Sequence, residues 1–433
     1  MPSPLVIRYA FTDIPDLPDR HPSGYIRPAD GRGKLVVPIG PQNPEFRLLE
    51  WLRKDFILEH DPVNPSHLFF STFGYDFLQF PEAIRIVLTS ENIHPDFNIC
   101  DYAFGFDRIE FGDRYARMPN FLLYEHFEEL VQRKQTSWQA EFSQRNFCNF
   151  IYTNRAGHPL RDELFHTLQT YRRVDSAGGH LNNMGKPLGR AYCGDWSGEK
   201  VSFQRGYKFS FAFENSSSPG YCTEKIVHAL AADSIPIYWG DPTVGRQFNS
   251  RRFINCHDFD SVDSMAEHIR RVDQDDALYR SMLNEPYFPS GNPAPELSSD
   301  YIRQRFGAIL SRPPSDAIRR NRHFWGRRYD ERLTEMWRSQ RFLHGKGGLA
   351  KFVRGLAKLT LRDWTVWHPG DHYYNFGLRV RLGHGVIRGQ GDRSGARWRR
   401  SSSAGHSHPN PASTVPDIGH RGYVGISGAG RSA

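Results

Sequence analysis

Short apolar runs alternate with amphipathic stretches along residues 5–310. The apolar runs, rich in aromatic and β-branched residues, predict buried strands at 5–11, 67–71, 84–89, 147–153, 207–213, 235–238 and 253–255. Apolar residues at helical spacing predict helices at 45–58, 120–145, 158–171, 224–232, 261–271, 278–283 and 297–310. This repeated strand–helix–strand order is typical of α/β domains with mostly parallel sheets.

The chain is long enough for two such domains and an appendage. Its 433 residues can bury two hydrophobic cores of ordinary size. We expect a first α/β domain over residues 1–140 and a second over 141–312. A basic amphipathic extension over 313–384 follows, and then a Gly-, Ser-, Arg- and Pro-rich tail over 385–433 that we expect to be disordered.

The excess positive charge lies entirely after residue 312. Residues 313–433 carry 22 Lys and Arg against 8 Asp and Glu, whereas residues 1–312 carry 34 against 40. A mildly acidic body argues against nucleic acid as a partner.

Residues 346–362 form the most basic amphipathic segment. One helical face is apolar and comprises Leu349, Phe352, Val353, Leu356 and Leu359. The opposite face is cationic and comprises Lys351, Arg354, Lys358 and Arg362. Such a helix suits an anionic membrane surface. The alternative is a helix that packs on the body with its cations in water.

Cysteine usage and the N-terminal residues favour the cytoplasm. The five cysteines are scattered without C-x-x-C spacing, which is typical of reduced thiols. The N-terminal residues include neither a basic segment followed by an apolar run nor a stretch of about 18 apolar residues. We therefore expect a cytoplasmic protein, peripheral on the inner face of the membrane.

The stretch 208–241 concentrates polar groups in a turn between a strand and a helix. The turn 214–220 follows the predicted strand 207–213, and Thr223 is expected to cap the next helix with its hydroxyl. In βαβ units, anionic ligands bind at the carboxyl ends of strands, near helix N-termini. Lys225 lies in the first helical turn, where a cation opposes the helix dipole. An anionic ligand would explain that placement.

The same residues carry a resemblance. The segments FENSSSPGYCTEK, IPIYWGDP and FNICDYAFGFDRIEFGDRYARMP resemble the α-1,3/4-fucosyltransferases, most closely the bacterial members, and the likeness covers about residues 84–288. It implies two Rossmann-like domains facing a cleft, the GT-B architecture. It also implies an inverting enzyme that uses GDP-fucose, with the 3-OH of N-acetylglucosamine in N-acetyllactosamine-like ends as its usual acceptor.

The resemblance also implies roles for individual residues. Glu91 follows the predicted strand 84–89 and matches the family's proposed base; a loop residue or helix cap is the alternative. Arg161, in the first turn of the helix 158–171, matches a phosphate-binding arginine; an exposed arginine is the alternative. The remaining donor-binding residues implied by the motif are Asn215, Tyr221, Glu224 and Lys225. Glu224 would bind sugar hydroxyls or stabilise developing positive charge, or would simply stabilise the helix.

We expect no catalytic metal and no cofactor beyond the donor substrate GDP-fucose. Residues 273–276 contain a D-x-D spacing, but they lie between two predicted helices, where a cap and turn is the better interpretation. The histidines lack metal-site spacing, and no G-x-G-x-x-G fingerprint occurs. Two other functions stay open: transfer from another nucleotide sugar, and a catalytically silent glycan- or membrane-binding protein of the same fold.

Overall fold

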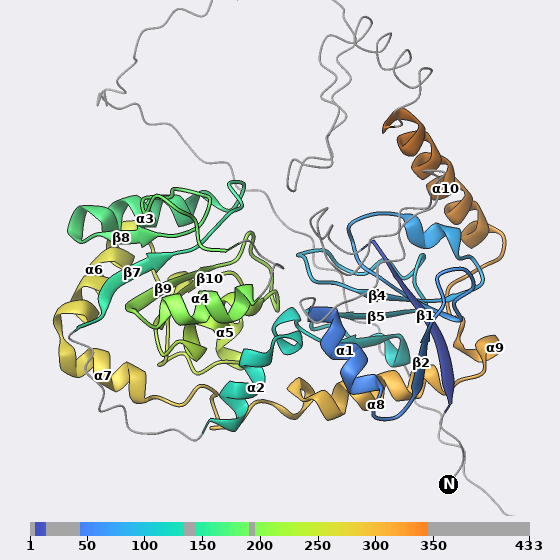
Figure 1. The fold of residues 1–433 in the computed structure, drawn as a ribbon, viewed down its shortest axis with the longest axis horizontal. Coiled ribbons are helices and arrows are strands. Elements are labelled where there is room, and N and C mark those ends of the chain that lie inside the picture. Colours follow the sequence, from blue (N-terminus) through green and yellow to red (C-terminus); the bar gives the residue numbers. More distant parts are fainter. Residues whose placement is uncertain (1–4, 14–43, 134–143, 190–194, 345–433) are drawn as a thin grey trace, which may run out of the picture. The chain divides into compact units, whose positions relative to one another are not determined.

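The computed structural model describes residues 5–13, 44–133, 144–189 and 195–344 (Figure 1). All of them belong to one compact unit, residues 1–380. The predicted amphipathic segment 346–362 and the predicted disordered tail lie outside the described residues. No helix within these ranges is both long enough and apolar enough to cross a bilayer.

The first sheet has six parallel strands in the order β2-β1-β3-β4-β5-β6. They are β1 (Val6–Thr12), β2 (Ile57–His60), β3 (His67–Phe70), β4 (Ile84–Leu88), β5 (Tyr102–Gly105) and β6 (Tyr115–Arg117). Every residue of β3, β4 and β5 is buried, as expected for parallel strands covered on both faces. The predicted helix 45–58 is too long. The helix α1 ends at Leu52, and Ile57 and Leu58 belong to β2.

Helices cover both faces of this sheet. On one face lie α1 (Pro44–Leu52) and α8 (Ser299–Leu310). The Phe306 ring of α8 stacks on Phe104 of β5 at 3.8 Å between centroids. On the other face, α10 (Trp325–His344) packs Leu333 and Trp337 against the cluster formed by β3 and the 3-10 helix Asp76–Gln79. The chain therefore returns to the first sheet near residue 299, although the sequence assigned residues up to 312 to the second domain.

A buried carboxylate fastens this returning segment. Asp101 is fully buried and accepts hydrogen bonds from the backbone N–H groups of Arg85, Arg319 and Arg320 at 2.7–2.9 Å. The Arg320 guanidinium also pairs with it, and Arg85 reaches Asp330 of α10 at 3.1 Å. These bonds join strand β4 to the segment between α8 and α10.

The second sheet has five parallel strands in the order β11-β10-β9-β7-β8. They are β7 (Asn146–Phe150), β8 (Val174–Ser176), β9 (Tyr207–Phe213), β10 (Ile235–Trp239) and β11 (Ile254–Asn255). One face packs against α3 (Pro159–Tyr171), α6 (Val262–Gln274) and α7 (Asp276–Asn284). The other packs against α4 (Trp196–Gln204) and α5 (Glu224–Ala231). Alternation along β9 explains the two layers, since Phe211 faces α3 and Ala212 faces α5.

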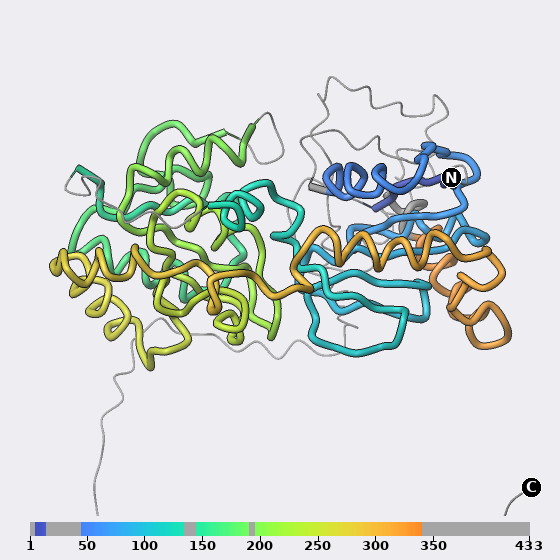
Figure 2. The backbone as a smooth tube through the Cα atoms, turned by 90° about the horizontal axis from the view of Figure 1, so that it is seen from below, coloured from blue at the N-terminus to red at the C-terminus, as the bar shows by residue number. Residues whose placement is uncertain are grey.

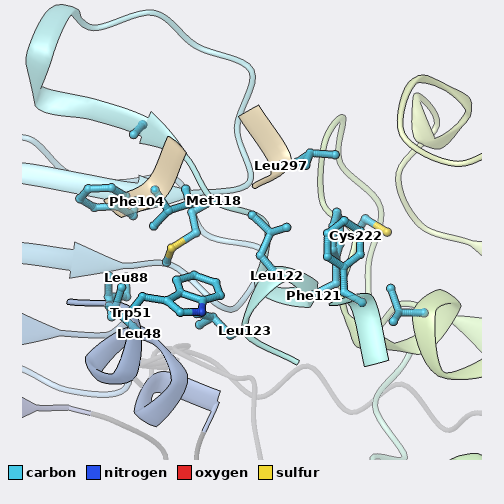
Figure 3. Packing of buried hydrophobic residues seen from close by; sticks show 14 of the residues in the cluster. Leu48, Trp51, Leu88, Phe104, Met118, Phe121, Leu122, Leu123, Cys222 and Leu297 are labelled. Carbon is cyan, nitrogen blue, oxygen red and sulfur yellow. The ribbon is translucent and has the colours of Figure 1, made fainter. Parts of the chain in front are cut away.

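One apolar cluster continues from the first sheet to the second. It includes Trp51 of α1, Met118 and Phe121 after β6, and Cys222 before α5 (Figure 3). The helix α2 (Glu125–Gln132) adds Phe127 to the same cluster. Figure 2 shows α8, in orange, lying along the first sheet after the chain leaves the second. The described cysteines, Cys100, Cys148, Cys222 and Cys256, are buried free thiols.

Candidate active site

Loops from the carboxyl ends of both sheets meet at one place. The loop after β4 donates from Asn92 Nδ2 to Ser216 Oγ, in the loop after β9, at 2.8 Å. The loop after β5 packs the Phe106 ring edge-on against Tyr221 with 5.1 Å between centroids. Carboxyl ends of parallel strands are where α/β folds bind ligands. The meeting point of these three loops is the candidate active site.

Glu91 and Tyr221, far apart in sequence, face each other here. Glu91 lies in a tight turn, in which Ile93 N donates to the Glu91 carbonyl at 2.7 Å, and its side chain is half-buried. The buried Tyr221 hydroxyl donates to Glu91 Oε2 at 3.5 Å, the outer limit of a hydrogen bond. The structure thus brings the predicted base next to a predicted donor-binding residue.

Lys225 is held by a carboxylate that the sequence analysis did not single out. Its Nζ lies 3.0 Å from Oε2 of the fully buried Glu214 and 3.6 Å from Glu224 Oε1. Burial alone would lower the pKa of Lys225, but Glu214 and Glu224 raise it above its ordinary value. A cation in the first turn of α5 therefore has an internal explanation, and an anionic ligand is not required to account for it.

Thr223 is the N-cap residue of α5, but its hydroxyl does not cap the helix as predicted. The Oγ1 atom lies 2.7 Å from Glu214 Oε2 and 2.9 Å from Lys225 Nζ, and Thr223 N donates to Glu214 Oε1 at 2.8 Å. The Thr223 hydroxyl therefore bonds to the Glu214 carboxylate and not to the helix N-terminus. A buried carboxylate without hydrogen-bond donors would destabilise the fold more than the loss of one cap bond does.

Glu224 is the first residue of α5, and two lysines, Lys225 and Lys200, act on its carboxylate. Burial acts to raise the pKa of Glu224, yet Lys225 and Lys200 together hold it below its ordinary value. Lys200, on α4, has no counterpart in the sequence-based site. Burial lowers the pKa of Lys200 to about 8, with Glu224 acting in the opposite direction. Only packing of α4 against α5 reveals this second lysine.

Arg161 is completely buried at the start of α3, so the exposed-arginine interpretation is wrong. Its guanidinium lies 4.6 Å from the centre of the Tyr152 ring. It donates from Nη2 to the Asn154 carbonyl at 3.0 Å and from Nε to Asp162 at 3.1 Å. The Nη1 atom has no hydrogen-bond partner among the described residues. A Cβ on Gly157 would come within 2.4 Å of it, so glycine lets the loop close over the arginine.

The remaining signature residues shape the loop after β9. The Asn215 carbonyl accepts from His158 N, at the start of α3, at 3.2 Å. Gly220 has φ +90°, and a Cβ there would meet the Phe106 carbonyl at 2.5 Å. The buried Asp241 accepts from Gly220 N at 2.7 Å. The loop therefore depends on a glycine at 220 and on the aspartate that ends the IPIYWGD run.

The acidic run 273–276 contributes to structure. Asp275 caps α7 by accepting from Leu278 N at 2.9 Å, as expected for a cap and turn. Asp273 is buried and pairs with Lys208 Nζ at 3.0 Å. Within the described ranges, no group of three or more His, Cys, Asp or Glu side chains is arranged to hold a metal ion.

Two family models match the chain in succession. The α-(1,3)-fucosyltransferase FucT N-terminal domain matches residues 40–124, and the glycosyltransferase family 10 (fucosyltransferase) C-terminal model matches residues 138–285. The α-(1,3)-fucosyltransferase FucT of Helicobacter pylori is 31% identical over 241 residues. The chain belongs to the fucosyltransferase family. It resembles the bacterial FucT protein over 48% of its own length and 48% of that protein, so it spans about half of this relative.

Solved fucosyltransferase structures share the fold. The crystal structure of an α1,3-fucosyltransferase with GDP is 25% identical, with a TM-score of 0.56 over 74% of this chain and 93% of that one. A crystal structure of an α1,3-fucosyltransferase with GDP-fucose also gives a TM-score of 0.56, at 24% identity. The predicted GT-B fold class is therefore confirmed.

Proposed function

We propose that the protein transfers L-fucose from GDP-fucose to a hydroxyl of a glycan, with inversion at the fucose anomeric carbon. Membership of the fucosyltransferase family supports the sugar and the donor. The observation that carries the proposal is the meeting of Glu91 with Tyr221, because it combines a carboxylate from the first half with the donor signature of the second.

Glu91 is the proposed general base. An inverting transfer needs a carboxylate that accepts the proton of the attacking hydroxyl. Glu91 is half-buried at the carboxyl end of β4, and the chain holds it in a hydrogen-bonded turn. The acceptor oxygen would attack the anomeric carbon as the bond to the GDP oxygen breaks, and the hydroxyl proton would pass to Glu91.

Lys225 and Arg161 are the proposed cations for the departing diphosphate. Fixed positive groups that meet developing charge in a dry site contribute strongly to catalysis. Lys225 is already ordered by Glu214, so it would not need to be positioned when the donor binds. Arg161 carries an unsatisfied Nη1, but the loop at Gly157 covers it. A phosphate contact to Arg161 therefore requires that loop to move, and we propose that donor binding moves it. We propose that the transfer needs no catalytic metal and no cofactor beyond the donor GDP-fucose.

The donor contacts assigned to Asn215, Tyr221 and Glu224 belong to the same proposal. Glu224 stays ionised beside two lysines, which suits hydrogen bonds from ribose or fucose hydroxyls. The proposed acceptor is the 3-OH of N-acetylglucosamine in an N-acetyllactosamine-like end. The α-1,3 linkage is supported by the H. pylori relative at 31% identity.

Radiolabelled transfer tests the proposal directly. Purified protein is incubated with GDP-[14C]fucose, or with GDP-mannose, UDP-galactose or UDP-N-acetylglucosamine carrying the same label, and with N-acetyllactosamine or lactose. We expect a labelled product from GDP-fucose only. Transfer from a different donor would move the assignment to another nucleotide sugar, and binding of a glycan without binding of GDP would indicate a silent binding protein.

Cytoplasmic location and membrane association complete the proposal. They rest on the basic amphipathic pattern of residues 346–362 and on the absence of disulfides among the described cysteines. We propose that this segment holds the enzyme on an anionic membrane face, where lipid-linked glycans would be its acceptors.

A further inference from the structure

A histidine–carboxylate pair lies beside Glu91: His94 belongs to the same loop after β4, and Asp107 belongs to the loop after β5. His94 Nδ1 is 2.5 Å from Asp107 Oδ1. The two partners differ greatly in exposure, since the His94 side chain is 69% exposed and the Asp107 side chain 6%. The second carboxylate oxygen of Asp107, Oδ2, is buried without a hydrogen-bond partner in the described part of the chain. The side-chain hydrogen bond of this buried carboxylate is thus made to a histidine at the surface.

Stability alone gives little reason for this arrangement. Taking a carboxylate out of water is costly, and an exposed partner returns little of that cost. Burial raises the pKa of Asp107, and His94 offsets this only in part. Tyr115 donates to the Asp107 backbone carbonyl at 2.9 Å, so the backbone is held independently of the carboxylate. A buried carboxylate that costs stability and holds an exposed histidine in place is typical of a functional site.

The bond to Asp107 fixes which histidine nitrogen faces outward. With Nδ1–H donating to the carboxylate, the neutral ring keeps a lone pair on Nε2. Carboxylate–histidine pairs use this device to orient an imidazole toward a substrate or a metal. In the neutral ring, His94 Nε2 is therefore a hydrogen-bond acceptor on the exposed side of the loop.

Packing connects His94 to the candidate active site. Its ring lies against Phe106, with 5.8 Å between centroids, and Phe106 also packs against Tyr221, at 5.1 Å. Tyr221 in turn reaches Glu91, which precedes His94 by one tight turn of the loop. Phe106 is buried, so it acts as a rigid spacer between the histidine and the tyrosine.

We propose that His94 binds a hydroxyl group of the acceptor saccharide through Nε2, with Asp107 as its positioning residue. The inference rests on the proposed function, because it takes Glu91 as the base and a glycan as the acceptor. A saccharide presents several hydroxyl donors, and a fixed imidazole acceptor beside the base selects the orientation in which the reacting hydroxyl meets Glu91. His94 and Asp107 thereby determine acceptor affinity and leave donor binding to the second half of the molecule.

Steady-state kinetics of variants test the assignment. His94→Ala should raise the KM for N-acetyllactosamine about 3- to 10-fold, as expected for one hydrogen bond. The KM for GDP-fucose and the rate of GDP-fucose hydrolysis in the absence of acceptor should not change. His94→Gln, whose amide can replace Nε2, should recover part of the affinity. His166→Ala, at an exposed histidine of α3, is the matched control and should behave as the wild type.

A double-mutant comparison separates positioning from folding. Asp107→Asn should raise the acceptor KM in the wild-type background and add nothing to it in the His94→Ala background, because the carboxylate acts through the histidine. Should Asp107→Asn fail to fold, the exposed His94 variants still decide the question.

The possible failures are distinguishable. Unchanged acceptor KM in His94→Ala, or an equal loss for donor and acceptor, would overturn the inference while transfer by the wild type remains. Absence of both GDP-fucose hydrolysis and transfer by the wild type would overturn the proposed function instead.

Discussion

Replacing Lys225 with methionine separates the two roles that this lysine has in our account. The change removes the ammonium group that is proposed to meet the donor diphosphate. It also leaves Glu214 as a carboxylate that is fully buried and without its cation, 3.0 Å away in the wild type. Folding and donor binding should both suffer, for different reasons.

The structure sets the size of the folding effect. At 3.0 Å and an effective dielectric constant of about 20, the Coulomb attraction between the two charges is about 5.5 kcal/mol. Breaking a buried pair from one side costs about 3–5 kcal/mol. Two hydrogen-bond donors of Thr223 remain on Glu214, so we expect a loss of free energy of unfolding near the lower value. The double variant Glu214→Gln/Lys225→Met has no unpaired charge at these two positions. It should regain most of the lost free energy of unfolding.

Donor binding should not recover in the double variant. A charge-assisted bond to phosphate is worth about 1.5–3 kcal/mol, so the Kd for GDP should rise about 10- to 150-fold in both the single and the double variant. Urea unfolding and calorimetric titration with GDP measure the two effects. Lys208→Met is the matched control for GDP affinity, because it removes another mostly buried lysine, at the opposite end of β9, whose partner Asp273 keeps Arg172 at 2.9 Å; its Kd for GDP should equal that of the wild type. Wild-type GDP affinity in the folded double variant would refute a phosphate-binding role for Lys225.

The remaining predictions concern proton transfer, acid stability and membrane binding. Glu91→Gln should lower kcat at least 100-fold while the Kd for GDP stays within 2-fold, and lost GDP binding would show that Glu91 has another role. Burial lowers the pKa of His67 to about 4, below about 6.5 in an unfolded chain, so protons favour unfolding as the pH falls. The free energy of unfolding should therefore decrease by about 2 kcal/mol through His67 between pH 7.5 and 5, and His67→Phe should lack this part of the urea-measured loss. Truncation after residue 345 should abolish sedimentation with phosphatidylglycerol vesicles and leave fucosyl transfer intact. Sedimentation that persists would contradict an anchor at 346–362.

Local pattern predicted the second sheet's central βαβ unit well. The strand expected at 207–213 coincides with β9, and the helix expected at 224–232 differs from α5 by one residue. Both elements have strong local signals, an aromatic run and an N-terminal cap position. The sequence pattern does not predict the short strands β5 and β6 inside the segment 97–119. Runs of three or four residues are too short to show the alternation that identifies a strand.

Long-range contacts account for what the sequence could not predict. Glu214 precedes Lys225 by eleven residues, and only its complete burial makes it the partner of that lysine. The stacking of Phe306 on Phe104 brings α8 back to the first sheet across about 200 residues of chain. Likewise, the pairing of His94 with Asp107 depends on how two strand-end loops approach each other, which spacing alone does not encode.

Proton NMR of the reaction product tests the central claim most directly. Wild-type protein is incubated with GDP-β-L-fucose and N-acetyllactosamine, and the anomeric signal and linkage of any new fucose residue are determined. Our account predicts a single α-linked fucose on the 3-OH of N-acetylglucosamine, formed by the wild type and not by Glu91→Gln. A β-linked product, or release of free fucose without any glycan product, would contradict it.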